Sequence, residues 1–164
     1  MVVDIELKRE KSYNVISTQY VGAYTGENML RKEFNLLVKW AKKNHVKLGK
    51  WFFTEIDGPD TVEDKRRWEA SIEVKGKLTA QLPEEIVQKK ISAQLVASVV
   101  FDPDEFSSRL VYHGLECWLD WRKKYHELEE DGPTREVYID NPWTSKKAWS
   151  NLDVQVPVKR VKKQ

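Results

Sequence analysis

The chain repeats itself at a spacing of about half its length. The segment that starts at Trp40 reads WAKKN and the segment that starts at Trp121 reads WRKKY, a separation of 81 residues. The same shift lays YNVISTQY, from Tyr13, on QLVASVVF, from Gln94. Such a repeat constrains the fold strongly, because both copies are expected to form the same supersecondary unit.

Two later landmarks keep the same order. The turn DGP at 57–59 matches DNP at 140–142 at a separation of 83, and KRRW at 65–68 matches KKAW at 146–149 at a separation of 81. A small drift of this kind is what a loop insertion produces. We therefore predict one domain over residues 1–164, made of two pseudo-symmetric halves at about 1–80 and 81–160.

The first half is predicted to contain a strand, a helix and two further strands. Residues 15–20 alternate as a strand, and Leu30, Phe34, Leu37 and Ala41 then recur at helical spacing. The aromatic run WFFTEID and the alternating ASIEVKG, which stops at Gly76, follow as strands. A helix that crosses between strands covers one face of a small sheet, which predicts an α+β fold.

The second half is predicted to repeat this order. VQKKISAQLVASVVF, residues 87–101, reads as one long strand, and REVYID and LDVQVPV read as the last two strands. A helix is predicted between the long strand and REVYID. Its buried stripe is predicted to contain Phe106, Leu110, Gly114, Cys117, Trp118, Trp121 and Tyr125, and Trp40 is assigned to the core of the first half.

Composition excludes several classes of protein. The net charge of +2 at 33% charged residues gives no strong field that would attract nucleic acid, and a single cysteine excludes an internal disulfide. No apolar run approaches the roughly 18 residues of a membrane span, and the first ten residues are too charged for a signal peptide. We expect a cytoplasmic location and no membrane contact.

The common catalytic and metal motifs do not occur in the sequence. There is no phosphate-binding glycine loop, GxSxG, HExxH or CxxC. His45, His113 and His126 are scattered, without the carboxylate spacing of a metal site. We therefore expect neither a metal nor a cofactor.

The stretch PTREVYIDNP, residues 133–142, reads as a strand with a carboxylate in its middle. Alternation places Val137 and Ile139 on one face, where they would enter the core, and Glu136, Tyr138 and Asp140 on the other. That other face has two interpretations, an ordinary wet surface or a binding site.

The repeat favours the binding site. Alignment of the two turns places Phe53 and Glu55 opposite Glu136 and Tyr138, so equivalent strands each carry an aromatic ring and a glutamate. An aromatic ring beside a carboxylate can hold a flat or cationic organic ligand, with a contribution of about 1 to 3 kcal/mol. The ordinary alternative is an exposed glutamate beside a half-exposed tyrosine.

Trp68 and Trp149 follow a KxxW segment, at the predicted start of the last strand of each half. Trp68 shares the parity of Ala70 and Ile72, whereas Trp149 is out of phase with Leu152. Their orientation is left open by the pattern.

Three segments resemble a known family. They are VGAY at 21–24, DGPD at 57–60 before KRRWEASIEV, and DGPTREVYIDNP at 131–142 followed by LDVQVPVK. Over residues 15–159 the chain is similar to the GyrI-like (gyrase-inhibitor-like) small-molecule-binding domains, which also serve as effector-binding domains of AraC-type and MerR-type regulators.

The resemblance implies a fold and a site. The fold is a duplicated strand-helix-strand-strand module in which two antiparallel sheets form a central groove, with the helices packed behind. Glu136 would be the polar anchor in that groove. Its companions would be Tyr138, Phe53, Trp68 and Trp149 as wall residues, Glu55 as a second carboxylate, and Tyr24 at the edge.

The function that follows is binding of hydrophobic, aromatic or cationic small molecules by a monomer or weak dimer. Without room for a helix-turn-helix in its 164 residues, the chain is not expected to bind DNA itself. The alternative is a detoxifying hydrolase of reactive cyclopropane-bearing electrophiles, since WEASIEV is similar to such family members. Glu55, Glu69 and Glu136 would be its acids. Restraint of a partner such as a topoisomerase follows from the family name alone.

Overall fold

The computed structural model describes residues 4–25 and 28–162, and the chain divides into two compact units. The continuous unit is residues 12–92, and the split unit combines the N-terminal residues up to Lys11 with the chain from Ala93 onward. The units therefore differ from the predicted halves. The first residues belong with the second half, and residues 81–92 belong with the first.

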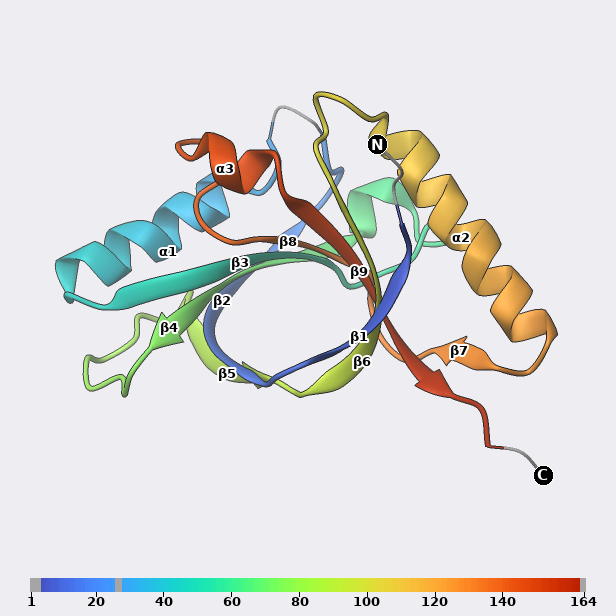
Figure 1. The fold of residues 1–164 in the computed structure, drawn as a ribbon. Coiled ribbons are helices and arrows are strands. Elements are labelled where there is room, and N and C mark those ends of the chain that lie inside the picture. The colour runs from blue at the N-terminus through green and yellow to red at the C-terminus, as the bar shows by residue number, and fades with distance from the viewer. Residues whose placement is uncertain (1–3, 26–27, 163–164) are drawn as a thin grey trace. The chain divides into compact units, whose positions relative to one another are not determined.

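The continuous unit is one antiparallel sheet with one long helix (Figure 1). Its strands are in the order β3-β4-β2-β5. Its elements are β2 (Tyr13–Val21), α1 (Arg31–Lys43), β3 (Lys47–Glu55), a 3-10 turn η1 (Glu63–Lys65), β4 (Arg67–Lys75) and β5 (Val87–Ile91).

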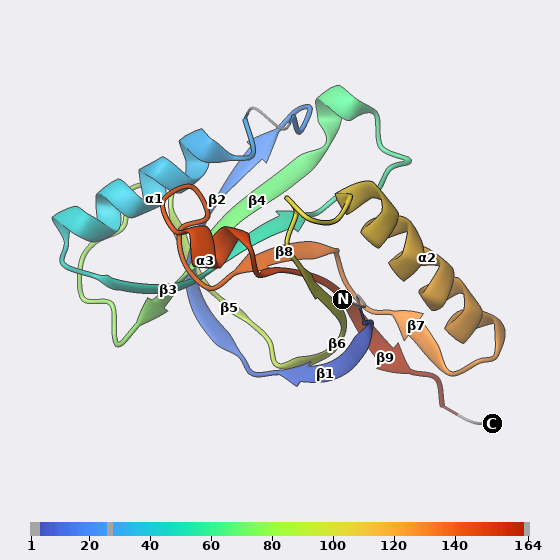
Figure 2. The ribbon, with the colours of Figure 1, turned by 45° about the horizontal axis from the view of Figure 1, so that its top comes forward.

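The split unit has the strand order β1-β6-β9-β8, and β7 also pairs with β9 (Figure 2). All of these pairings are antiparallel. Its elements are β1 (Glu6–Glu10), β6 (Gln94–Phe101), α2 (Ser108–Lys124), β7 (Leu128–Glu130), β8 (Arg135–Tyr138), α3 (Lys146–Trp149) and β9 (Leu152–Arg160).

The predicted duplication is visible in the strand pairing. The first half runs β2-α1-β3-β4 and the second runs β6-α2-β8-β9, apart from the short β7 and α3. In both, the last strand of the module lies between the other two, as β3-β4-β2 and as β8-β9-β6. The α+β class and the duplicated strand-helix-strand-strand module are confirmed.

The long strand predicted over residues 87–101 is wrong. The segment forms β5 and β6, with a break at Ser92 and Ala93. β5 pairs with β2 of the continuous unit, whereas β6 pairs with β1 and β9 of the split unit. The two parts have different partners, which the alternation of a single strand does not reveal. The first strand, β1, was not predicted because its sequence ELKRE is mostly charged.

The helix of the continuous unit buries the predicted residues. Phe34, Leu37 and Ala41 are almost completely buried, and Trp40 is 9% exposed. The ring of Phe34 stacks on Trp51, with a centroid distance of 4.8 Å. This face of α1 packs against the sheet and forms part of the hydrophobic core of the unit.

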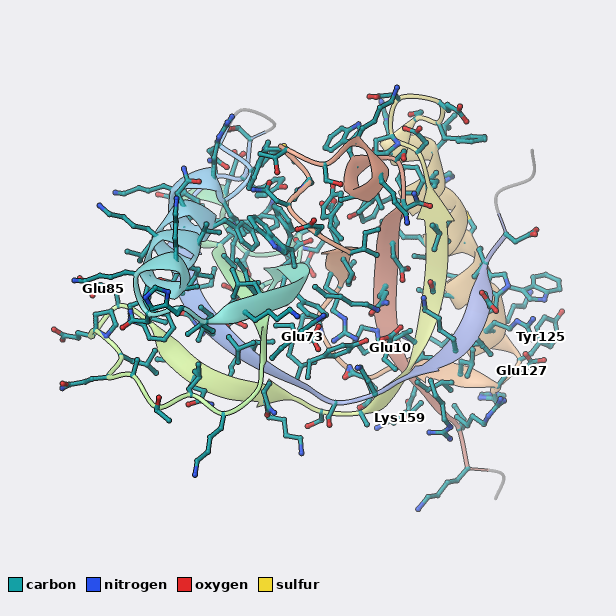
Figure 3. All side chains as sticks on the ribbon, turned by 60° about the vertical axis from the view of Figure 1, so that its left-hand side comes forward. Glu10, Glu73, Glu85, Tyr125, Glu127 and Lys159 are labelled. Atoms are coloured by element: carbon teal, nitrogen blue, oxygen red, sulfur yellow. The ribbon has the colours of Figure 1, made fainter. Side chains whose placement is uncertain are left out.

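Most of the stripe predicted for the second helix is exposed, and only Phe106 and Trp118 of its members are half-buried. Among the described residues of α2, Leu115 and Leu119 are buried. Leu110 is 70% and Trp121 59% exposed, and Tyr125, labelled in Figure 3, is 52% exposed just beyond the helix end. Helix α2 carries apolar residues around much of its circumference, and periodicity alone does not tell which of them contact the sheet.

The other face of the split unit's sheet carries a buried polar network. Asp153 accepts hydrogen bonds from the Nζ of Lys8 (2.7 Å), the Oγ of Ser98 (2.5 Å) and the Nε2 of Gln155 (2.8 Å). Gln155 Nε2 also donates to Glu10 Oε1 (3.2 Å), which attaches β1 to β9; Glu10 is labelled in Figure 3. Burial lowers the pKa of Lys8, but the opposite effect of the nearby carboxylates Asp153 and Glu10 is larger. The net pKa therefore lies above 10.5. Two of the four charged residues of β1, Lys8 and Glu10, are therefore partners in this network, whereas Glu6 and Arg9 are exposed.

No helix among residues 4–25 and 28–162 is long and apolar enough to cross a membrane.

The core role of Phe34 gives a stability prediction. Replacement of Phe34 by Ala should lower the free energy of unfolding by about 3–5 kcal/mol, because it removes a fully buried ring and leaves a cavity. Urea denaturation followed by tryptophan fluorescence measures this change. Leu36→Ala, on the exposed side of the same helix, is the control and should change stability by about 0.5 kcal/mol or less.

Candidate functional site

Glu136 lies on β8 and points toward helix α2. It is paired with Val154 on β9, and Val154 is paired with Val99 on β6, so the three side chains share one face of the sheet. Val99 lines a hollow together with Leu115 of α2, which identifies this face as the helix side. The hydroxyl of Tyr112, on α2, donates a hydrogen bond of 2.6 Å to Glu136 Oε1.

The alternation of this strand was assigned to the wrong sides. Val137 is buried as predicted, but it shares the face of the polar network with Arg135, whose Nε donates to Gln155 Oε1 (2.9 Å). Ile139 is 45% exposed and follows the last residue of β8. Glu136 therefore lies on the helix side, and Ile139 is not a core residue.

Tyr138 and Trp149 lie close to each other in the split unit. Their rings are nearly parallel, at 10°, with centroids 6.2 Å apart. Tyr138 is 1% exposed, and Trp149 is half-buried. Trp149 is the last residue of α3, where the Oγ of Ser145 caps the helix by accepting from the N–H of Ala148 (3.1 Å). The prediction that Trp149 starts a strand is wrong, and its helical position explains the lost parity with Leu152.

We call Tyr112, Glu136, Tyr138 and Trp149 the acid site. Three of the four were predicted, and Tyr112 was missed. The signal that would have found it is the spacing of Tyr112, Leu115 and Leu119, which places all three on one side of α2. That pattern competed with the more strongly aromatic stripe on the opposite side.

The continuous unit has a second cluster of predicted residues. Glu55 at the end of β3 is directly opposite Trp68 on β4. The indole N–H of Trp68 donates to the carbonyl oxygen of Gly22 (3.0 Å), and its ring stacks on Tyr24 with centroids 4.6 Å apart. The structure thus brings Glu55, Trp68 and Tyr24 into one neighbourhood.

Phe53 also lies on the helix side of its sheet. Its ring centroid is 4.3 Å from that of Phe34 on α1, and Phe53 is only 4% exposed. Because Trp68 is two residues before Ala70, the direct partner of Phe53, it shares this face. The orientation of Trp68 is thereby settled, and Phe53 is part of the core packing.

The carboxyl of Glu55 has a perturbed pKa. Partial burial raises this pKa, and the nearby charge of Arg66 offsets part of that effect, so the net pKa lies above 4.5. Asp57, two residues further, behaves in the opposite way. Hydrogen bonds from the side chain and backbone of Arg67 hold the pKa of Asp57 below 3.8.

Glu69 does not join Glu55. It is directly opposite Thr54 on β3, so its side chain is on the other face of the sheet. There it is buried, forms an ion pair with Lys89 and accepts a hydrogen bond from the Oγ of Ser71 (3.2 Å). Glu55 and Glu69 therefore do not face one ligand within this sheet. The central groove between the two halves stays a prediction.

The fold and the acid site are typical of proteins that bind small organic molecules. An antiparallel sheet with a long helix on one face occurs twice, and a half-buried carboxylate with a tyrosine donor lies beside aromatic rings on the helix side. A few polar groups placed among aromatic and apolar side chains are typical of sites that bind small organic molecules.

The chain belongs to the GyrI-like family. The model of the GyrI-like small molecule binding domain matches residues 3–159. A search of the curated proteins gives no match.

Solved structures share the fold. The match to the C-terminal domain of EcmrR has a TM-score of 0.75 at 20% sequence identity, and it covers 98% of this chain and 100% of the EcmrR domain. The match to SAV2435, bound to tetraphenylphosphonium, has a TM-score of 0.53 at 13% sequence identity. It covers 95% of this chain and 94% of SAV2435. The match to a hydrolase encoded by lin2189 from Listeria innocua has a TM-score of 0.56 at 12% sequence identity. It covers 94% of this chain and 91% of the hydrolase chain.

A longer EcmrR chain is known in a complex with DNA. There, 97% of this chain matches 58% of that chain, at 20% identity and a TM-score of 0.75. That this chain does not itself bind DNA stays a prediction.

The shifted pKa of Glu55 gives a prediction of pH-dependent stability. A carboxyl whose pKa is raised by folding makes stability fall as pH rises from 4.5 through the folded-state pKa. Glu55→Gln removes this effect and should raise the free energy of unfolding at neutral pH, with a difference that shrinks below pH 4.5. Urea denaturation over a pH series measures the difference.

Asp57→Asn is the control of opposite sign. The lowered pKa of Asp57 stabilises the fold above pH 3.8, and this contribution is lost as pH falls through the folded-state pKa. The variant should be less stable than the unmodified chain at neutral pH, with the difference disappearing in acid. A Glu55→Gln variant that is less stable at neutral pH would contradict the burial effect.

Proposed function

We propose that this chain binds hydrophobic molecules with aromatic or cationic groups, and that the carboxylate of Glu136 is the polar group that holds them. The observation that carries the proposal is the 2.6 Å hydrogen bond from the Tyr112 hydroxyl to Glu136, on the helix side of the sheet and two residues from Tyr138. The family to which the chain belongs supports the class of ligand.

The surroundings of Glu136 suit such a ligand. The cross-strand neighbour Val154 is fully buried, and the half-buried ring of Trp149, which stacks on the buried ring of Tyr138, supplies flat apolar area. Glu136 itself keeps partial exposure to solvent. A carboxylate in partly apolar surroundings attracts a cation more strongly than one in bulk water, because the effective dielectric constant is lower. The Tyr112 hydroxyl fixes the direction of the carboxylate.

The charge of the ligand can be tested with two probes of the same shape. A protein of the same fold is described bound to tetraphenylphosphonium, and tetraphenylborate is its anionic counterpart. Titration calorimetry should detect binding of the cation by the unmodified chain. Glu136→Gln should raise the Kd for tetraphenylphosphonium about tenfold, which corresponds to ~1.4 kcal/mol, and should leave the Kd for tetraphenylborate unchanged or lower it.

Glu105→Gln, at an exposed position before α2, is the matched control and should bind the cation like the unmodified chain. Tyr112→Phe removes the hydrogen bond but keeps the charge, so its effect should be smaller than that of Glu136→Gln. Equal affinities of the unmodified chain and Glu136→Gln for the cation would remove Glu136 from its role.

A hydrolase of reactive electrophiles is the second candidate function, and the observation that favours it is the pKa of Glu55. A carboxyl with a raised pKa holds a proton at higher pH and can act as a general acid. Glu55 is opposite Trp68, whose ring would supply an apolar wall. Glu69, on the other face of the sheet, is not its partner.

Product analysis tests this second function. The chain is incubated with a cyclopropane-bearing electrophile, and ring-opened product is measured by mass spectrometry. If Glu55 is the acid, Glu55→Gln should lower the rate by about 10²-fold or more, whereas Glu63→Gln, on the exposed η1 turn, should not. A chain that forms no product above the uncatalysed rate lacks this activity.

A further inference from the structure

One flank of α2 carries an apolar stripe that is exposed to solvent. Leu110, Trp121 and Tyr125 are 70%, 59% and 52% exposed, and Cys117 between them is exposed as well. Gly114 completes the stripe, and a Cβ built on it would meet open space. Exposed apolar side chains that gather on one face mark an interaction surface, whereas isolated ones are ordinary.

The stripe has the same spacing in both directions. Leu110, Gly114, Cys117 and Trp121 follow one another at intervals of four, three and four residues, so two large residues flank two small ones. If a second copy of α2 packs antiparallel about the middle of the stripe, Leu110 meets Trp121 of the second copy and Gly114 meets Cys117 of the second copy. This is the self-complementarity of a twofold interface. The small central residues allow the two helices to approach closely.

The charges along one edge of the stripe favour the antiparallel arrangement. Successive residues of an α-helix are rotated by about 100°, which places Arg109, His113, Glu116 and Asp120 on the same edge. The first two are basic residues and the last two are acidic. In an antiparallel twofold pair the same edges of the two helices meet, which brings Arg109 close to Asp120 of the second copy and opposite charges together.

A hollow lies where the second copy's tryptophan would arrive. It has a volume of about 250 Å³, lies between α2 and the residues Ile5 and Val99, and is also lined by Leu110 and Gly114. Pockets for drug-sized ligands measure about 300–1,000 Å³, so this hollow suits a single large side chain better. Tryptophan is enriched among the residues that contribute most to binding at interfaces, particularly where it fills a pocket.

We propose that the chain forms a twofold-symmetric dimer through α2, in which Trp121 of each copy fills the hollow beside Leu110 of the other. The proposal is independent of ligand binding at the acid site, because Tyr112 and Glu136 lie on the sheet side of the helix.

Sedimentation velocity of the full chain over a wide range of concentrations tests the proposal. The unmodified chain should pass from monomer to dimer as concentration rises. Trp121→Ala should raise the dimer Kd at least about tenfold, because it removes the side chain that fills the hollow. Lys123→Gln, an exposed position of the same helix away from the stripe, is the control and should dimerise normally.

Gly114→Gln separates loss of the dimer from loss of the fold. The new side chain meets open space in the monomer, and glutamine is the better helix former, so the thermal midpoint of the monomer should rise. The same side chain separates the two helices and should also raise the dimer Kd at least about tenfold. An unmodified chain that stays monomeric at all concentrations, or a dimer that persists in both variants, overturns the proposal.

Cys117 gives a second measurement. It is the single cysteine of the chain, and the antiparallel packing brings it close to Cys117 of the second copy. Diamide, which takes up the two electrons and two protons released, should join the two thiols in a disulfide-linked dimer visible on a non-reducing gel. Trp121→Ala should yield much less of this product, and equal yields from both proteins would count against the interface.

Discussion

Each sheet is covered by one long helix on one face, and this constraint organises the rest of the structure. The helix side can be apolar, as around Phe34 in the continuous unit and Leu115 in the split unit. The opposite face holds buried polar groups, which need partners because an unsatisfied buried group is costly. In the split unit these partners are supplied by Lys8, Asp153 and Gln155. The placement of Glu136 on the helix side is therefore an exception that calls for its own donor, and Tyr112 provides one.

The order of the elements could be predicted from the sequence, because a repeat spacing survives even where individual residues diverge. The sides of the elements could not. A strand that is buried on both faces, such as β8, lacks the clean alternation that identifies a half-exposed strand. Helix α2 carries apolar residues on two sides, and its more aromatic side is exposed. The hydrogen bond from Tyr112 to Glu136 and the burial of Leu115 and Leu119 tell which side faces the sheet.

The two copies of the module use equivalent positions differently. Phe53 and Glu136 correspond in the alignment of the turns, and each is paired with an apolar residue of the neighbouring strand, Ala70 or Val154. In one copy this position is filled by a ring that packs on the helix, and in the other it holds a carboxylate bound by the helix. The two copies of the module therefore use the same position for different purposes, core packing in one and a polar group in the other.

The division of the split unit into two sequence segments affects the order in which the chain can fold during synthesis. The residues of the continuous unit are complete once Ser92 has left the ribosome, but β1 pairs with β6 and shares a polar network with β9, near the end of the chain. Strand β1 is made before the continuous unit and must therefore wait for partners that are made after it, across a loop whose closure has an entropic cost. An apolar strand in that position would be exposed to aggregation. The charged residues of β1 thus oppose aggregation of the waiting segment, and two of them, Lys8 and Glu10, later become partners in the network.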